Sequence, residues 1–209
     1  MKLEYVLPDE IEKRSFEIIS DELGDIKILD EIRPILMRVI HTTADFDYLE
    51  NLKFSENAVK TALDAIKKGA VFVTDTNMAK SGINKPALKK LGCTAECFMA
   101  DDDVADIAKQ KCITRATASV DKASQIDTPV IYAVGNAPTA LIRLYEHLQS
   151  GTFSPALIIG VPVGFVNVVQ SKEMIMSCDT EYIVAVGRKG GSNVAAAICN
   201  ALLYMAGGR

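Results

Sequence analysis

The stretch "PVIYAVGNAPTALIRLYEHLQSG" (residues 129–151) predicts a buried strand that runs through a short loop into a helix. Its first residues form an apolar run rich in β-branched side chains, as in strands covered on both faces. The period then changes to helical, because Leu141, Leu144 and Leu148 share one stripe and Pro138 stands in the first turn. A strand followed by a helix is the repeating unit of α/β folds.

The same unit recurs along the chain. Further buried strands are predicted at "AVFVTDT" (70–76), "PALIIGVPVG" (155–164) and "EYIVAVG" (181–187), and further helices at 9–23, 57–69, 101–109 and 192–207. In the first of these helices Ile11, Ile18 and Ile19 are expected on one buried face. We therefore expect a single α/β domain over residues 1–209, a three-layer αβα fold with a mostly parallel central sheet.

Composition excludes several classes of protein. With 49% hydrophobic and 24% charged residues, the chain is typical of globular proteins. A net charge of −4 and the lack of a basic stripe argue against a nucleic-acid partner. The beginning turns acidic before any apolar core, and the apolar runs are too short and too broken by proline and glycine to span a bilayer. We expect no membrane partner and a cytoplasmic location.

The five cysteines are scattered along the chain, at positions 93, 97, 112, 178 and 199. An odd number without a framework spacing favours buried free thiols over disulfides. Cys93 and Cys97 are spaced like half of a metal site, but no second close pair completes it. No bound metal is expected.

Small and polar residues follow each predicted strand, in "TDTNMAKSG" (74–82), "GNAPT" (135–139), "GVPVGF" (160–165) and "GRKGGSN" (187–193). Carboxyl ends of parallel strands are where ligands bind, so these loops are expected to converge. "GRKGGSN" is a candidate anion site, although it matches neither a P-loop nor a dinucleotide motif. The alternative is a tight turn with Ser192 as helix cap.

Two other polar residues in these loops have more than one interpretation. Asp75 is a catalytic carboxylate, a metal ligand, or a residue that organises its loop through hydrogen bonds to the backbone. Asn136 is either a cap for the helix that follows or part of a ligand site that Gly135 lets a ligand approach.

The chain has only 2 histidines. His147 stands near the end of the predicted helix 137–151, where the helix dipole favours a surface histidine. His41 lies in "RVIHTTADFDY" (38–48), where an apolar stretch gives way to a polar turn. It is a packed core residue, a metal ligand or a proton carrier; its place at the end of an element, where active groups often stand, keeps the last interpretation open.

Several segments in order resemble the precorrin-8X methylmutase family, including its cobalt-precorrin-8 branch, of corrin-ring biosynthesis. They are "RSFEII" (14–19), "RVIHTTADFDY" (38–48), "FSENAV" (54–59), "VTDTNMAKSGI" (73–83), "TRA" (114–116), "GNAPTAL" (135–141), "GVPVGFV" (160–166), "SKE" (171–173) and "RKGGSNVAAA" (188–197). After "GVPVGFV" the family pattern has a glycine and later a glutamate, where this chain has Asn167 and Gln170.

The resemblance implies an isomerase that moves a methyl group from carbon C11 to C12 of a tetrapyrrole, without an organic cofactor or a protein-bound metal. The family's catalytic histidine lies in "HTTAD", which here makes His41 the residue that gives a proton to the ring C region and takes it back. The resemblance also implies a homodimer with the pocket near the subunit interface.

A tetrapyrrole substrate with many carboxylate arms also suggests which residues bind it. The candidate contacts are Arg14, Ser15, Arg38, Thr42, Thr76, Lys80, Arg115, Lys189 and Ser192. Two alternative functions use the same residues without a methyl shift. One is a tetrapyrrole carrier without catalysis, and the other is an α/β enzyme that binds a phosphate-bearing ligand at "GRKGGSN".

Overall fold

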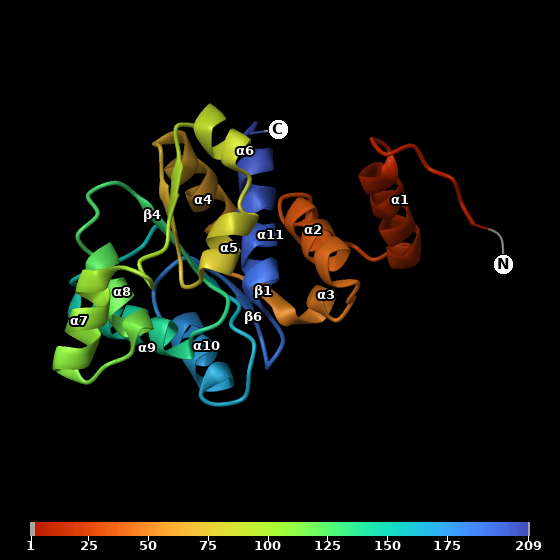
Figure 1. Ribbon diagram of the computed structural model, residues 1–209. Helices are drawn as coiled ribbons and strands as arrows, with labels where there is room; N and C mark the ends of the chain where they lie inside the picture. The colour runs from red at the N-terminus through yellow and green to blue at the C-terminus, as the bar shows by residue number, and fades with distance from the viewer. Residues whose placement is uncertain (1–2, 209) are drawn as a thin grey trace.

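A six-stranded sheet in the order β1-β6-β5-β4-β2-β3 forms the centre of the protein (Figure 1). The computed structural model describes residues 3–208. The strands are β1 (Leu52–Phe54), β2 (Val71–Thr74), β3 (Thr94–Glu96), β4 (Val130–Val134), β5 (Leu157–Gly160) and β6 (Tyr182–Ala185). Only β1 runs antiparallel to its neighbour, so the mostly parallel sheet is confirmed. The edge strands β1 and β3 were not predicted, because three residues are too few to show a period.

Helices cover both faces of this sheet. On one face lie α4 (Ala58–Lys67), α5 (Asn77–Gly82), α6 (Lys85–Lys90) and α11 (Ser192–Met205), and on the other lie α8 (Arg115–Ala123), α9 (Pro138–Ser150) and α10 (Val168–Met176), with α7 (Asp102–Lys111) against α8. Strand β4 shows the division, because Ile131 joins the first core while Val130 and Tyr132 join the second. The three-layer αβα architecture is confirmed.

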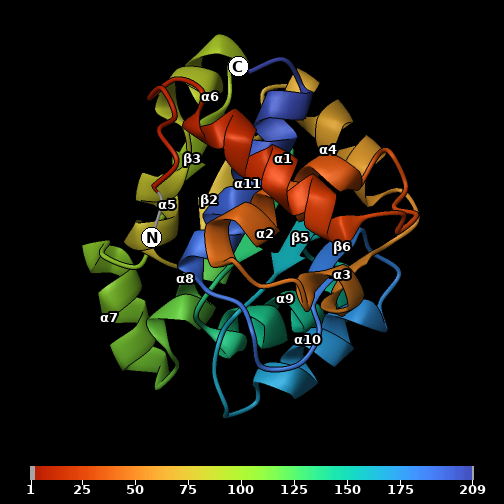
Figure 2. The same ribbon diagram turned by 90° about the vertical axis from the view of Figure 1, so that its right-hand side faces the viewer.

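Two helices lie outside this arrangement. Helix α2 (Arg33–Thr43) packs on α11, and α1 (Ile11–Leu23) packs on α2, as Figures 1 and 2 show. The expected buried face of α1 is partly wrong, since Ile19 is buried but Ile11 and Ile18 are 53% and 40% exposed. Helix α1 packs mainly on α2, so only a narrow stripe of its apolar residues is buried.

Helix α2 was not predicted, although it carries His41. Its apolar residues Ile35, Leu36, Met37, Val39 and Ile40 are all buried, because α11 and α1 cover it from two sides. Such all-round burial removes the one-sided periodicity by which an amphipathic helix is found. The short α3 (Tyr48–Asn51) follows and leads into β1.

All five cysteines are free. Cys93, Cys97 and Cys199 are buried as expected, whereas Cys178 is half-buried and Cys112 is exposed, so the prediction of buried thiols is wrong for these two. Among residues 3–208, no group of three or more His, Cys, Asp or Glu side chains is arranged to hold a metal ion. No helix in the same range is long and apolar enough to cross a bilayer.

Asn167 occupies a left-handed backbone conformation at the start of α10, with φ 58° and ψ 11°. The family pattern has glycine at this position. Asparagine is one of the few other residues that tolerate this region, because its short side chain can hydrogen-bond locally. Gln170 is exposed. Neither departure from the pattern therefore demands a different backbone.

Replacing Asn167 should separate the backbone requirement from the side chain. We expect Asn167→Gly to unfold at nearly the wild-type urea concentration. Asn167→Val should lose about 1–2 kcal/mol, because a β-branched residue is strained at positive φ. Equal stability of the two variants would show that the left-handed conformation places no demand on this residue.

Candidate active site

The order of the strands reverses between β2 and β4. From β2 the chain moves outward to β3, whereas from β4 it moves the opposite way through β5 to β6. Ligands of open α/β sheets bind at such a switch point, beyond the carboxyl ends of the strands. Here the hydroxyl groups of Thr76 and Ser192 meet at 2.8 Å. A Cβ on Gly135 would lie 2.7 Å from the Ser192 Cα, so the loops converge as predicted.

Asp75 is a buried carboxylate at this switch point. It is 1% exposed, and its carboxylate accepts hydrogen bonds from the backbone N–H groups of Gly135 (2.8 Å), Asn136 (2.8 Å) and Ala137 (2.6 Å). Burial raises the pKa of Asp75, and the three N–H donors oppose that effect. Asp75 therefore organises a loop, as one interpretation held, but the loop is the one before α9 rather than its own.

The two helix caps predicted from these loops are wrong. The cap position of α9 is Ala137, and the exposed Asn136 makes no side-chain cap bond; its own backbone N–H donates to Asp75 instead. Ser192 is the first residue of α11 rather than its cap, and its hydroxyl bonds to Thr76. Gly191 takes the cap position at φ 141°.

Lys189 ties the loop after β6 to the segment that follows His41. Its ammonium lies 2.6 Å from carboxylate oxygens of both Asp45 and Asp47. These hydrogen bonds raise the pKa of Lys189 and lower that of Asp45. The charge of Lys189 is therefore compensated within the chain, which weakens it as a contact for a substrate anion.

His41 lies in the last turn of α2, as expected of a residue at the end of an element. Its exposed ring stacks at a tilt on Phe16 of α1, with 5.2 Å between the ring centroids. None of the residues 3–208 is found to hydrogen-bond to its ring nitrogens. Partial burial, and then the charge of Arg38, lower the pKa of His41 below its usual 6.5. The ring is thus mainly neutral at pH 7 and open to a ligand.

Arg38 stands one turn before His41 on the same face of α2. Its guanidinium lies 5.3 Å from the Phe16 ring centroid and 4.8 Å from that of Tyr204 on α11, and it pairs with Glu12 at 2.9 Å. Cation–π contacts and an ion pair thus hold it beside the histidine. The charge of Arg38 is therefore close enough to lower the pKa of His41.

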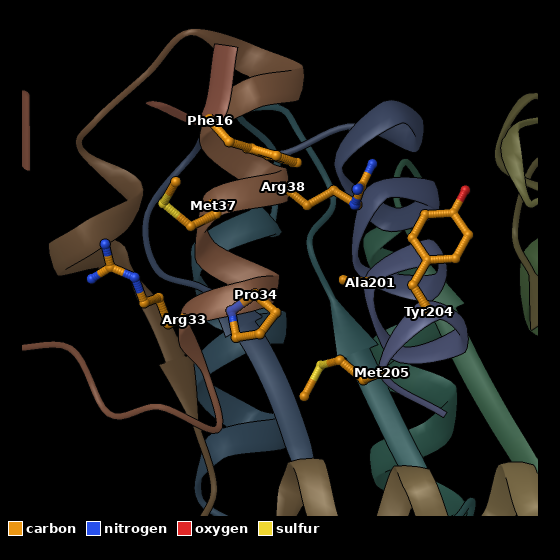
Figure 3. A pocket seen from close by; sticks show the side chains of 8 residues that line it. All are labelled: Phe16, Arg33, Pro34, Met37, Arg38, Ala201, Tyr204 and Met205. Atoms are coloured by element: carbon orange, nitrogen blue, oxygen red, sulfur yellow. The ribbon is translucent and has the colours of Figure 1, made fainter. Parts of the chain in front are cut away.

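A hollow of about 410 Å³ opens beside this cluster, between α1, α2 and α11 (Figure 3). Its walls are Phe16, Arg33, Pro34, Met37, Arg38, Ala201, Tyr204 and Met205. Arg38 is the only predicted contact among them. Phe16, Tyr204 and Met205 escaped prediction because apolar residues on helices look like core in a sequence. These residues form the wall of one hollow because α1, α2 and α11, which are distant in sequence, lie together in the fold.

The remaining predicted contacts are distributed over other elements. Ser15 bonds to its own helix, at the carbonyl oxygen of Ile11. Arg14 pairs with Glu4 and Glu17, and Lys80 pairs with Glu96. Arg115 begins α8, and Thr42 is exposed beside His41. A single chain thus does not gather all the candidate contacts around one hollow.

His147 is buried, so its prediction as a surface histidine is wrong. Its Nε2 lies 2.9 Å from Oδ1 of Asp121, and its Nδ1 lies 2.7 Å from the Thr152 hydroxyl. Asp121 also accepts a 2.6 Å hydrogen bond from Nε of Arg143. This face of α9 packs against α8, which the sequence around His147 does not reveal. His41 remains as the accessible imidazole.

An α/β sheet with polar loops beyond its strand ends, and an accessible imidazole beside a hollow, places this chain among the α/β proteins that bind a small ligand near this edge of the sheet. Comparison with known proteins narrows the class. A sequence profile described as precorrin-8X methylmutase matches residues 10–205. The chain belongs to the precorrin-8X methylmutase family, whose named members are isomerases.

Individual relatives agree with this assignment. The cobalt-precorrin-8 methylmutase of Salmonella typhimurium is 44% identical, with 94% of this chain and 95% of that protein covered. The one of Leptospira interrogans is 42% identical, with 95% and 94% covered. A crystal structure of the precorrin-8X methylmutase of Thermus thermophilus superposes with a TM-score of 0.86 at 38% identity, covering 95% of this chain and 98% of that one.

The influence of Arg38 on His41 can be measured in the free protein. Because a nearby positive charge disfavours the imidazolium, Arg38→Met should raise the pKa of His41. Titration of the imidazole resonances by NMR would show this, and Arg115→Met, which removes a cation from α8, should leave the midpoint in place. An unchanged midpoint in Arg38→Met would contradict the assigned electrostatic contact.

Proposed function

We propose that this protein moves a methyl group from carbon C11 to C12 of precorrin-8X or cobalt-precorrin-8, giving hydrogenobyrinate or cobyrinate in corrin-ring biosynthesis. Membership of the family supports this activity. The observation that carries the mechanism is the accessible ring of His41 at the end of α2, beside Phe16 and Arg38. The identities of 44% and 42% to cobalt-precorrin-8 methylmutases favour the cobalt-containing substrate.

The proposed mechanism is a 1,5-sigmatropic shift assisted by His41. The imidazolium donates a proton to the ring C region, the bond from the methyl group to C11 breaks as the bond to C12 forms, and the imidazole takes the proton back. The lowered pKa makes the imidazolium a stronger acid but the minor form at pH 7, so the shift proceeds through the protonated fraction of His41. The step is an isomerisation without a net change in electrons or protons, so it calls for neither an organic cofactor nor a protein-bound metal.

The hollow beside His41 suggests how the substrate lies. Its volume of about 410 Å³ is near the lower end of the range for small-molecule sites, roughly 300–1,000 Å³. It therefore takes part of a tetrapyrrole, with the apolar ring against Phe16, Tyr204 and Met205. Arg38, in the wall of the hollow, is placed to bind one carboxylate arm. The other candidate contacts lie outside the hollow and stay predictions, namely Arg14, Ser15, Thr42, Thr76, Lys80, Arg115, Lys189 and Ser192.

Removing His41 tests the reaction and its mechanism together. With wild-type protein, precorrin-8 or its cobalt form should undergo a lasting change of absorption spectrum. We expect His41→Ala to lower kcat by about 10²- to 10⁴-fold while still binding the ring, because the proton donor is lost and the pocket is not. His147→Gln, at the other histidine, should keep kcat although it removes part of a buried hydrogen-bond network.

Each alternative has its own outcome in this assay. Turnover by His41→Ala at the wild-type rate would refute the proton-transfer role. Tight binding of an unchanged substrate by the wild-type protein would support the carrier without catalysis. Failure to bind either ring would exclude both tetrapyrrole functions and leave the phosphate-ligand enzyme as the candidate to pursue.

We also propose that the protein is a homodimer. The family implies this state, and several apolar residues at the amino-terminal end are exposed, namely Leu3, Tyr5, Leu7, Ile11 and Ile18. Clustered apolar surface of this kind marks an interaction site. Sedimentation equilibrium should give about twice the chain mass of 22.6 kDa, and Ile11→Glu should weaken the association. A wild-type mass of a single chain would refute the dimer.

A further inference from the structure

Lys172 is a buried cation without an acidic partner. Its residue on α10 is 1% exposed, and its Nζ donates hydrogen bonds to the carbonyl oxygens of Gly187 (2.8 Å) and Lys189 (2.9 Å). No Asp or Glu side chain of residues 3–208 lies within ion-pair distance of it. Burial lowers the pKa of Lys172 to about 8. Burying a charged group costs free energy, so the two hydrogen bonds from Lys172 point to a role for the segment that it holds.

The two carbonyl groups belong to the residues before and after Arg188, so Lys172 is hydrogen-bonded to the turn on both sides of that residue. Arg188 is exposed, and its guanidinium lies 5.3 Å from the ring centroid of Phe165, which is 79% exposed. The carbonyl oxygen of Arg188 also accepts a 3.2 Å hydrogen bond from the N–H of Gly164. The loops after β5 and β6 are thereby joined, and a cation and an aromatic face stand together on their outer side.

The two cations in this turn differ in whether a carboxylate of the chain compensates their charge. Lys189 is neutralised by Asp45 and Asp47. Arg188 has no carboxylate within ion-pair distance in the part of the chain that the structure describes. Its guanidinium can bind a carboxylate with two parallel hydrogen bonds, and the neighbouring Phe165 offers an apolar surface. Arg188 is therefore the cation of "GRKGGSN" that is open to an external anion.

We propose that Lys172 is a positioning residue that holds the 187–191 turn so that Arg188, together with Phe165, binds a carboxylate arm of the substrate. Without the two hydrogen bonds from Nζ, the carbonyl groups of Gly187 and Lys189 lose their buried donor and the turn relaxes. The substrate in this inference rests on the proposed function, whereas the effect of Lys172 on the turn does not.

A double-mutant cycle tests whether Lys172 acts through Arg188. Lys172→Met and Arg188→Met should each weaken binding of the corrinoid product by about tenfold, as loss of a charge-assisted contact predicts. The double variant should bind no more weakly than either single variant, because both changes remove one contact. Lys172→Met and Arg188→Met should each raise KM and change kcat little. Absorbance titration and steady-state kinetics give these values, with Lys122→Met, at a lysine held by Asp101 and Asp103 on the surface, as unchanged control.

Independent effects that multiply to about a hundredfold loss in the double variant would overturn the proposal, as would unaltered binding by Arg188→Met. If Lys172→Met does not fold, Lys172→Gln, which keeps an amide donor, takes its place in the same cycle. The purely structural alternative predicts a lower unfolding midpoint with wild-type KM and wild-type product affinity.

Hydrogen exchange of the free protein separates this inference from the proposed function. The amides of residues 187–191 should exchange at least tenfold faster in Lys172→Met, and at the wild-type rate in Arg188→Met. Unchanged exchange in Lys172→Met overturns the positioning role, whatever the protein binds. If exchange increases as expected but the wild-type protein binds no corrinoid, the proposed function fails while the role of Lys172 in the turn stands.

Discussion

The carboxylate of Asp75 is the contact on which the arrangement beyond the strand ends depends. It satisfies three consecutive backbone N–H groups between β4 and α9, at the place where the sheet reverses its order. Gly135 is buried, so its N–H group alone would cost about 1–3 kcal/mol if it lost this acceptor, whereas water can reach Asn136. The loop held in this way leaves room for the start of α11, whose Ser192 backbone lies directly above Gly135.

The position of His41 follows from that of α11. The main packing partner of helix α2 is α11. The end of α2 is held further by Lys189, which binds Asp45 and Asp47 just after the histidine. Water screens exposed ion pairs of this kind, so this segment is tied more loosely than the buried loop that Asp75 holds. The histidine thus stands on a peripheral helix next to an open hollow, where a broad ligand can reach it.

Several features of the site were predictable from local sequence. The four central strands, the helices α4, α7, α9 and α11, and the place of His41 at the end of an element follow from periodicity and from residues at element ends. The convergence of Thr76 and Ser192 follows as well, since carboxyl ends of parallel strands share one edge. Asn167 shows a subtler case, because its residue type already suits the left-handed backbone that it adopts.

Other features depended on partners far away in the chain. Periodicity failed for α2 because two helices bury it from opposite sides, and the site of His147 is buried by α8. The true partner of Asp75 lies in another loop, and the charge of Lys189 is cancelled by aspartates 142 and 144 residues away in sequence. By itself the sequence determined the four central strands, the longer amphipathic helices and the chemical groups at their ends, because those depend on neighbours within a few turns. Only the tertiary structure decided which of these groups remain free to meet a ligand, because burial and charge compensation arise from contacts between distant segments.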